Sequence, residues 1–335
     1  MEQTIADIGK VEAVDSLFRG TRYEHQRKAV FCPEAGATVV TATKVYQEGL
    51  DFNLVYFPLP HLGYKCTLGV TGELYASLAR PKTLSVVLGV SSRFSFPQIQ
   101  ELWKGILSAA REHGYEALDL DLVPCPNGLS ISLGATGWVS RLTAARRSKA
   151  RSKDLVCVSG SLGAAYMGFR LLEKGLEAFD RDGTQPDLEK NRMLVAAYLK
   201  PELEASVVQR LEEAEIYPSY GYFLTSGLAD GLRRLQRDSG LGVKVYADRI
   251  PFEGNTFATG KALDIDPVGA AMSGGDDFRL LFTVPILSLE KFRRDFQTFD
   301  IIGHLAQPDA GTVLVTPEGV EFPVKAQGWK DESEA

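Results

Sequence analysis

Cysteine is scarce in this sequence, and its spacing argues against the usual cysteine-based sites. The four cysteines are far apart and form no C-x-x-C pair: Cys32, Cys66, Cys125 and Cys157. Structural zinc sites use closely spaced ligand pairs, and disulfide frameworks belong mainly to small secreted domains. We therefore predict reduced thiols and a cytoplasmic location.

Long apolar runs and an excess of basic charge are also absent. No uninterrupted apolar run approaches the ~20 residues that span a bilayer. The first seven residues, M-E-Q-T-I-A-D, are acidic and have no hydrophobic core, unlike a signal peptide. The formal net charge is −6, which disfavours non-specific binding to nucleic acid. We expect neither a membrane nor a nucleic acid as partner.

The length and the apolar pattern predict two α+β domains. A chain of 335 residues exceeds one ordinary core, and its 44% hydrophobic content is that of a globular protein. Apolar periodicity predicts strands and helices in both halves. Strands are expected near residues 37–43, 84–90, 117–123, 129–139, 155–158, 243, 280 and 313. Helices are expected at 97–113, 188–199, 206–216 and 289–296, with others ending near 179 and 240.

A basic segment separates the two halves. Residues 141–153 contain six basic residues and no acidic one. We place the domain boundary at its start, giving domains 1–140 and 141–335. Arg146, Arg147 and Arg151 could clamp a polyphosphate, because a planar guanidinium matches phosphate oxygens. From composition alone, a solvated basic linker is the favoured explanation of this segment.

Two glycine-containing turns in the second half are candidate ligand sites. Residues 159–163, S-G-S-L-G, lie between an expected strand and helix, where free amides can hold an anion. As a bare pattern this is also an ordinary strand–helix turn. Residues 273–277, S-G-G-D-D, precede an apolar strand. Glycine permits close backbone approach to a ligand, and paired carboxylates suit a cation.

These segments resemble motifs of the thiamine-monophosphate kinase family. Residues 273–285, S-G-G-D-D-F-R-L-L-F-T-V-P, resemble its S-G-G-E-D-Y-E-L-L-F-T-V-P segment. Residues 145–163 resemble its R-R-S-G-A-R-P-G-D-L and T-G-T-L-G block, and residues 227–232, G-L-A-D-G-L, its D-I-S-D-G-L. Scaffold segments at 48–52, 62–65, 78–81, 129–137 and 328–329 also match. The resemblance covers roughly residues 1–330. The F-T-V-P ending and the R-R-S block favour this branch of the aminoimidazole-ribonucleotide synthetase-like superfamily over its sister families.

The resemblance implies a fold, a dimer and a reaction. It implies an N-terminal synthetase-like domain whose sheet pairs with a second subunit into a dimeric β-sheet or barrel, and a C-terminal α+β domain. Residues 62–65 and 129–137 are expected in strands that need this partner. The implied reaction passes the terminal phosphate of ATP to thiamine monophosphate, with Mg²⁺ as cofactor, and yields thiamine diphosphate.

The resemblance also assigns roles to residues of this chain. The implied catalytic residues are Asp230 and Asp277. Nucleotide or phosphate binding is implied for Arg146, Arg147, Arg151, Gly160, Gly163 and Lys44. Substrate binding is implied for Gly49, Asp51, Gly274, Gly275, Asp276 and Trp329, of which Trp329 could stack on the thiamine. The implied metal ligands are Glu73, Asp121 and Asp230. Asp230 in a first helical turn is also explained by the helix dipole alone.

The sequence departs from the family where magnesium-ATP is bound. The family's T-T-D is T-A-T-K here, so Lys44 reverses a charge. Ala164 and Gly227 replace two further aspartates, whereas Glu73 keeps a carboxylate on a longer stem. The G-G-D-T-T segment becomes residues 121–125, D-L-V-P-C. Mg²⁺ needs near-octahedral oxygen ligands, so we predict that the magnesium cluster is weak or absent, and the sequence leaves open whether ATP binds.

Three interpretations follow. The chain is a thiamine-monophosphate kinase with a degraded magnesium-ATP site, a catalytically silent homologue that binds a phosphorylated metabolite or nucleotide, or a structural dimer partner. The third interpretation explains the scaffold but not the G-G-D-D turn. Lys44 could place an ammonium where a cation lies in the family, which would favour an anion without its metal.

Overall fold

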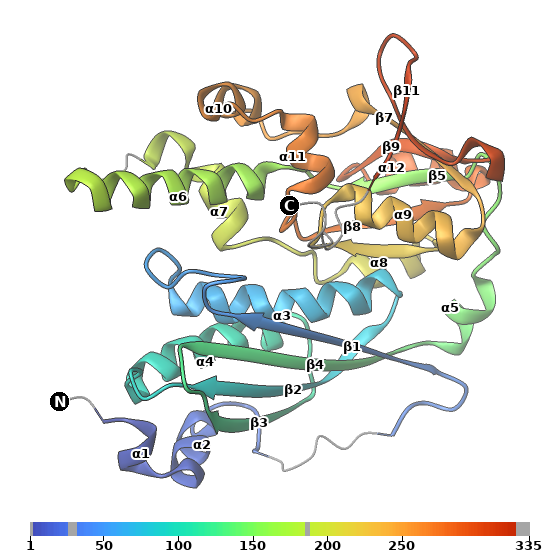
Figure 1. The fold of residues 1–335 in the computed structure, drawn as a ribbon. Helices are drawn as coiled ribbons and strands as arrows, with labels where there is room; N and C mark the ends of the chain where they lie inside the picture. Colours follow the sequence, from blue (N-terminus) through green and yellow to red (C-terminus); the bar gives the residue numbers. More distant parts are fainter. Residues whose placement is uncertain (1–2, 26–31, 185–187, 326–335) are drawn as a thin grey trace, which may run out of the picture. The chain divides into compact units, whose positions relative to one another are not determined.

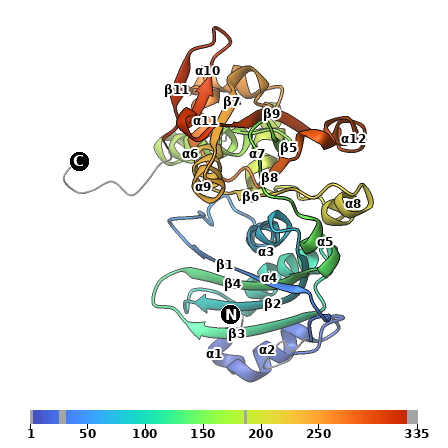
Figure 2. The same cartoon turned by 90° about the vertical axis from the view of Figure 1, so that its right-hand side faces the viewer.

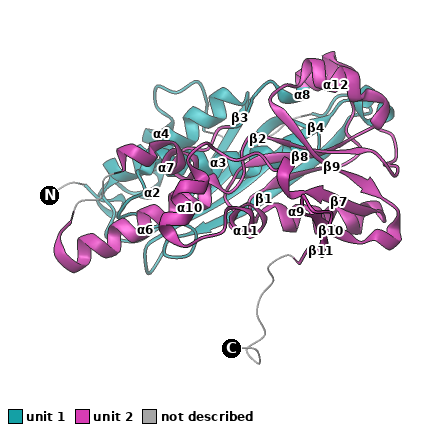
Figure 3. Ribbon diagram, turned by 90° about the horizontal axis from the view of Figure 1, so that it is seen from above, with its two compact units in different colours: residues 1–146, 203–208 teal, residues 147–202, 209–335 magenta. Residues whose placement is uncertain are grey.

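The computed structural model describes residues 3–25, 32–184 and 188–325. The chain divides into two compact units, shown in Figure 3. Unit 1 comprises residues 1–146 and 203–208, and unit 2 comprises residues 147–202 and 209–335. The units therefore separate six residues after the boundary expected from the basic segment, and a short stretch of the second half belongs to unit 1.

Unit 1 is built on a four-stranded mixed sheet with the order β1-β4-β2-β3. Its strands are β1 (Thr38–Gln47), β2 (Arg80–Val90), β3 (Ala117–Pro124) and β4 (Leu129–Val139). The β2–β3 pair is parallel, and β4 runs antiparallel to β1 and β2. The ribbon in Figure 1 shows these strands in blue to green.

Helices cover one face of this sheet. The helices of unit 1 are α1 (Ile5–Ile8), α2 (Lys10–Phe18), α3 (Leu59–Ala76), α4 (Phe96–Glu112) and α5 (Arg141–Arg146). Helix α3 packs against β1, β4 and α4. Residues of β4 alternate between buried and partly exposed, as in a strand with one covered face. On the other face Val45, Ser132 and Val87 lie in register, and Val45 and Val87 are exposed.

Residues 62–65 lie inside helix α3, so the expectation that they form a strand was wrong. Nearly every residue of α3 from Leu62 to Ala76 is buried. A helix that is apolar all round shows no polar face from which its period can be read. Its approach to α4 depends on two glycines, because a Cβ on Gly63 would lie 2.1 Å from the carbonyl oxygen of Leu102 and one on Gly105 would lie 2.0 Å from that of Pro60.

Unit 2 is built on a seven-stranded mixed sheet with the order β11-β10-β7-β9-β5-β8-β6. Its strands are β5 (Leu155–Ser159), β6 (Gly221–Leu224), β7 (Gly242–Tyr246), β8 (Arg279–Val284), β9 (Phe299–Ala306), β10 (Thr312–Val315) and β11 (Glu321–Pro323). Only the β7–β10 pair is parallel within this sheet of the described chain. Figure 2 shows the ribbon of Figure 1 turned by 90°, with the strands of this sheet among its labelled elements.

The helices of unit 2 bury apolar residues against this sheet. They are α6 (Ala164–Asp182), α7 (Arg192–Leu199), α9 (Leu228–Ser239), α10 (Thr256–Leu263), α11 (Pro267–Ser273) and α12 (Leu289–Asp295), while α8 (Val207–Glu213) begins in unit 1. The core includes Val156 and Leu281 of the sheet and Leu232 of α9. A smaller cluster joins α6, α7 and α11 through Met167, Leu194 and Ala270.

The α+β prediction is confirmed by two mixed sheets with helices in each unit. The expected strand 129–139 and the expected helix 97–113 are both present, the latter as α4. Strands β6 and β9 and helices α10 and α11 were not predicted, and most of them are short. None of the four cysteines forms a disulfide within the described residues, and no described helix is long and apolar enough to cross a bilayer.

Candidate functional site

Three loops meet at one end of neighbouring strands in unit 2. They follow β5 (residues 159–163), follow β6 (225–227) and precede β8 (273–278). The amide of Asp276 donates to the carbonyl oxygen of Thr225 at 3.0 Å, and that of Phe278 donates to the carbonyl of Leu224 at 2.9 Å. The glycine turns that the sequence singled out are therefore parts of one loop cluster.

Asp277 ties two of these loops together. Its side chain is buried, with 4% of the residue exposed, and Oδ2 accepts a hydrogen bond from the amide of Gly163 at 3.0 Å. Oδ1 has no hydrogen-bond partner among the described residues. Burial raises the pKa of Asp277 to about 7, although the Gly163 amide acts in the opposite direction. A carboxyl group that titrates near neutrality can hold or release a proton at physiological pH.

The loop before β8 has a strained backbone. Asp276 and Phe278 have positive φ angles of 59° and 53°, which non-glycine residues rarely adopt and which cost on the order of 1–3 kcal/mol each. Gly275 has φ of 80°, and a Cβ on Gly274 would lie 2.5 Å from the carbonyl oxygen of Ala270. Such strain clusters at ligand sites, so this loop is a candidate ligand contact.

The family's first aspartate before α9 cannot be restored in this backbone. Gly227, the N-cap of α9, has φ of 90°, and a Cβ there would lie 2.5 Å from the carbonyl oxygen of Met272. Asp230 stands in the first turn of α9 and pairs with Nε of Arg234 at 2.9 Å. This internal guanidinium already balances the carboxylate that was predicted to serve both in catalysis and as a metal ligand.

Arg279 is a basic residue of this cluster that the sequence interpretation missed. Its Nε donates to the carbonyl oxygen of Ser161 and its Nη1 to that of Glu202, both at 3.3 Å. Its guanidinium carbon would lie 3.1 Å from a Cβ on Gly160. Two of the five N–H donors of this arginine make these bonds. The signal was present in the sequence, since the matching family segment has glutamate at this position.

The basic segment before β5 ties backbone segments together. Arg147 donates from Nε to the carbonyl oxygen of Pro218 at 3.1 Å and from Nη2 to that of Ser219 at 3.0 Å, and burial lowers its pKa. The amide of Arg151 donates to Asp154 at 2.8 Å. Arg146 ends helix α5 in unit 1 and is exposed. These contacts account for the side chains of Arg147 and Asp154 without a phosphate.

Unit 1 contributes an ion pair between β1 and α3. Nζ of Lys44 lies 3.5 Å from Oε1 of Glu73, and the side chains are 30% and 24% exposed. Asp121 is in register with Val87, Ser132 and Val45 on the face of the sheet that α3 does not cover, and it pairs with Lys10. Glu73 and Asp121 of one chain therefore do not share an ion.

The remaining predicted residues are spread along the chain. Gly49 and Asp51 form the turn after β1, where Oδ2 of Asp51 accepts from the amide of Gln47 at 2.7 Å. Trp329 lies outside the described residues. Within the described ranges, no group of three or more His, Cys, Asp or Glu side chains could hold a metal ion.

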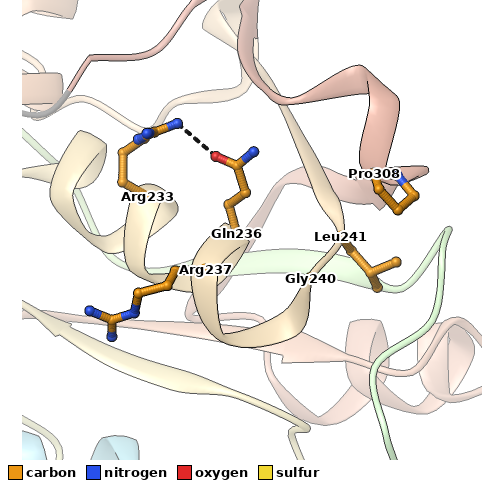
Figure 4. Close-up of a pocket in the computed structure, with 6 residues that line it drawn as sticks. All are labelled: Arg233, Gln236, Arg237, Gly240, Leu241 and Pro308. Atoms are coloured by element: carbon orange, nitrogen blue, oxygen red, sulfur yellow. Dashed lines mark hydrogen bonds between the residues drawn. The ribbon is translucent and has the colours of Figure 1, made fainter.

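Unit 2 also has a surface hollow at the far end of α9, drawn in Figure 4. It has a volume of about 360 Å³ and is lined by Arg233, Gln236, Arg237, Gly240, Leu241 and Pro308. Arg233 donates to Gln236 and Arg237 to Asp238, each at 2.7 Å. The lining residue nearest to Gly227 along α9 is Arg233, six positions away or about 9 Å along the axis, and no residue of the three loops lines the hollow.

Sequence comparison relates the chain to thiamine-monophosphate kinases. It is 28% identical over 268 residues to the enzyme of Pyrococcus horikoshii, covering 80% of this chain and 78% of the relative. It is 25% identical over 259 residues to that of Synechococcus elongatus, covering 76% and 74%. No family model matches the chain.

Solved structures give the same relationship. The thiamine-monophosphate kinase of Stenotrophomonas maltophilia superposes with a TM-score of 0.70 at 25% identity, over 84% of this chain and 86% of that one. A ThiL structure complexed with AMPPCP and TMP gives 0.71 at 20% identity, over 95% and 98%. The hydrogenase maturation protein HypE of Escherichia coli gives 0.70 at 15% identity, over 94% and 96%, and shows that the fold is shared. The chain is a divergent relative of the thiamine-monophosphate kinases and has their two-domain, aminoimidazole-ribonucleotide synthetase-like fold.

Proposed function

We propose that this thiamine-monophosphate-kinase-like protein binds a small phosphorylated ligand and that its magnesium-dependent phosphoryl transfer is strongly weakened. The fold and the motifs support the relationship to the kinases, and a related structure is complexed with AMPPCP and TMP. The loss of carboxylates supports the weakening. Phosphoryl transfer depends on positioning and on neutralising charge, which metal ions largely provide.

The observation that carries this proposal is the ion pair of Lys44 and Glu73. In the family motifs both positions carry a carboxylate. Here an ammonium group lies 3.5 Å from the remaining carboxylate, so Glu73 already has a cationic partner. Gly227 removes a further family carboxylate, because its backbone leaves no room for the aspartate side chain that the family has at this position. A magnesium ion bound at these positions would have to compete with a built-in positive charge.

The unit 2 loop cluster supports binding of a phosphorylated ligand. Arg279 lies against the Gly160 turn, and it replaces an acidic residue of the family segment, as Lys44 does in unit 1. Guanidinium groups and loop amides are the usual donors to phosphate oxygens. Lys44 and Arg279 both replace an acidic residue of the family with a basic one. These two changes favour the binding of an anion that is not complexed with a metal ion.

Calorimetric titration with thiamine monophosphate and with ATP, each with and without Mg²⁺, tests this proposal. We expect binding of at least one of these ligands with a Kd that Mg²⁺ does not lower. Lys44→Asp should make binding of ATP more dependent on Mg²⁺. Lys104→Asp, a charge reversal on the exposed face of α4, should behave like the wild type. Binding that requires Mg²⁺ in the wild type would contradict the proposal.

We further propose that unit 1 forms a homodimer through the sheet face that α3 leaves uncovered. This face carries the exposed side chains of Val39 and Val45 on β1 and of Val87 on β2. Exposed valines in register on a sheet suit burial against a second copy. Sedimentation at micromolar concentration should give a dimer that Val45→Glu dissociates, and a monomeric wild type would exclude this interface. The structural-partner interpretation requires this dimer but no ligand.

A further inference from the structure

The surface hollow at the end of α9 is a candidate ligand site that the proposed function does not use. Its volume is about 360 Å³, and no residue of the loop cluster or of the family motifs lines it. In Figure 4, Arg233 and Gln236 project from the helix, and Leu241 and Pro308 lie together beyond its end. The hollow therefore has a polar side on the helix and an apolar side next to the start of β7.

The polar side of the hollow carries one unbalanced positive charge. Nε of Arg237 donates to Oδ1 of Asp238 at 2.7 Å, so this arginine already has an acidic partner. Among the described residues, the guanidinium of Arg233 contacts Gln236, with Nη1 donating to Oε1 at 2.7 Å, and has no acidic partner. A single positive charge matches a monoanion, whereas a doubly charged phosphate would leave one negative charge unmatched.

The remaining donors of Arg233 have the geometry that a carboxylate requires. Because Nη1 bonds to Gln236, the edge of the guanidinium formed by Nε and Nη2 keeps its two N–H donors for a ligand. A carboxylate accepts two parallel hydrogen bonds from such an edge, which fixes the direction of approach as well as the charge. The donor set of the hollow therefore favours a carboxylate among the monoanions.

Gln236 holds this guanidinium in place. Its Oε1 accepts from Nη1 of Arg233 at 2.7 Å and from the hydroxyl of Thr312 on β10 at 2.9 Å. Thr312 is only 4% exposed, so the glutamine is anchored to the sheet of unit 2. The two-donor edge is thus oriented before a ligand enters, and this reduces the conformational entropy that binding must offset.

The apolar side of the hollow is also fixed. The amide of Leu241 donates to Oγ of Ser239 at 3.2 Å, which holds the turn after α9. A Cβ on Gly242 would lie 2.4 Å from the carbonyl oxygen of Gln307, so the turn that carries Pro308 packs closely on the start of β7. The side chain of Leu241 and the ring of Pro308 therefore form a preformed apolar wall.

The size of the hollow fits one ring that carries a carboxylate. An apolar cavity of about 150 Å³ is large enough to bind benzene, and this hollow has about 360 Å³. We propose that it binds a small aromatic monocarboxylate, whose carboxylate pairs with Nε and Nη2 of Arg233 and whose ring lies against Leu241 and Pro308. The site is independent of the proposed kinase-like function, because no residue of the loop cluster takes part.

Benzoate, benzamide and acetate are matched probes, because benzamide lacks the charge of benzoate and acetate lacks its ring. Amide chemical shifts of the full chain should move at residues 233–241 and 307–311 when benzoate is added. Benzoate should bind roughly tenfold more tightly than benzamide or acetate, the effect of a charge-assisted hydrogen bond or of a partly buried ring. Shifts only elsewhere, or equal affinities for benzoate and benzamide, would overturn the proposal. Inorganic phosphate that binds here as tightly as benzoate would overturn the choice of a carboxylate.

Four variants locate the effect. Arg233→Gln should weaken binding of benzoate roughly tenfold and leave that of benzamide unchanged, and Arg233→Lys, which keeps the charge without the two-donor edge, should recover only part of the loss. Pro308→Ala should weaken binding of benzoate but not of acetate. Arg293→Gln, at an exposed arginine of α12, is the matched control and should bind as the wild type does. Unchanged benzoate binding in Arg233→Gln would overturn the assignment, and full recovery in Arg233→Lys would overturn the two-donor contact.

Discussion

Lys44 and Glu73 form an ion pair between β1 and α3, with Nζ 3.5 Å from Oε1. Both side chains are partly exposed, so the pair itself contributes little to folding, on the order of 0–1 kcal/mol. Its importance is chemical, because it puts an internal cation beside a carboxylate retained from the family pattern.

Gly227 should tolerate no side chain. Gly227→Asp, which restores the family residue, and Gly227→Ala should each lower the free energy of unfolding by about 2 kcal/mol or more, through a positive φ and a clash with Met272. Gly240→Ala is the matched control, since Gly240 has φ of 68° but nothing near its Cβ position. Urea unfolding measures the difference, and equal losses at the two sites would show that the clash is relieved.

Asp277 should make stability depend on pH near neutrality. Its folded-state pKa, about 7, lies above the ordinary value of 3.8 because the carboxyl is buried. The stability it contributes is therefore complete below pH 4 and is lost as the pH rises through 7. Asp277→Asn keeps an acceptor for the Gly163 amide but does not titrate.

As the pH rises from 4.5 to 7.5, the free energy of unfolding of the wild type should therefore fall relative to that of Asp277→Asn. Asp230→Asn, at a partly exposed ion pair, serves as the control and should show no such trend in this range. A wild type that gains stability relative to Asp277→Asn as the pH rises would contradict the buried, raised-pKa carboxyl.

His113 should make the folded state less stable as the pH falls below neutrality, the opposite dependence to that of Asp277. It is 4% exposed, its Nδ1 lies 3.0 Å from the hydroxyl of Tyr75, and burial lowers its pKa from 6.5 to about 4. The folded state therefore disfavours the protonated ring. Its contribution is complete above pH 6.5 and is lost as the pH falls toward 4. When the pH is lowered from 7 to 4.5, the thermal unfolding midpoint of His113→Asn should fall less than that of the wild type. Midpoints that fall in parallel in the two proteins would refute this.

Arg279 should contribute to the binding of phosphorylated ligands. Arg279→Gln removes the guanidinium charge beside the Gly160 turn, and we expect at least a tenfold weaker Kd for thiamine monophosphate or inorganic pyrophosphate, in line with the loss of a charge-assisted hydrogen bond. Arg233→Gln, in the middle of α9 and in the lining of the separate hollow, is the matched control. Unchanged affinity in Arg279→Gln would limit this residue to holding the carbonyls of Ser161 and Glu202.

Strands β3 and β4 and the amphipathic helix α4 could be predicted from the sequence because each exposes one polar face. Helix α3 could not, since burial on all sides hides its period. The turns at residues 159–163 and 273–277 could be singled out as candidate sites from their glycines and acids. The contacts that engage the predicted site residues were harder to predict. Arg234 pairs with Asp230 within one helix, but Arg147 donates to the carbonyls of residues 218 and 219, about seventy positions further along the chain. Only the folded chain brings such groups together.

Formation of thiamine diphosphate by the purified protein, supplied with thiamine monophosphate, ATP and Mg²⁺, tests the central claim most directly. With Lys44 paired to Glu73 and Gly227 closed to a side chain, we predict a turnover at least a thousandfold below the enzyme median of about 10 s⁻¹. A turnover near that median would contradict the account, because it would mean that the remaining carboxylates still assemble a working magnesium-ATP site.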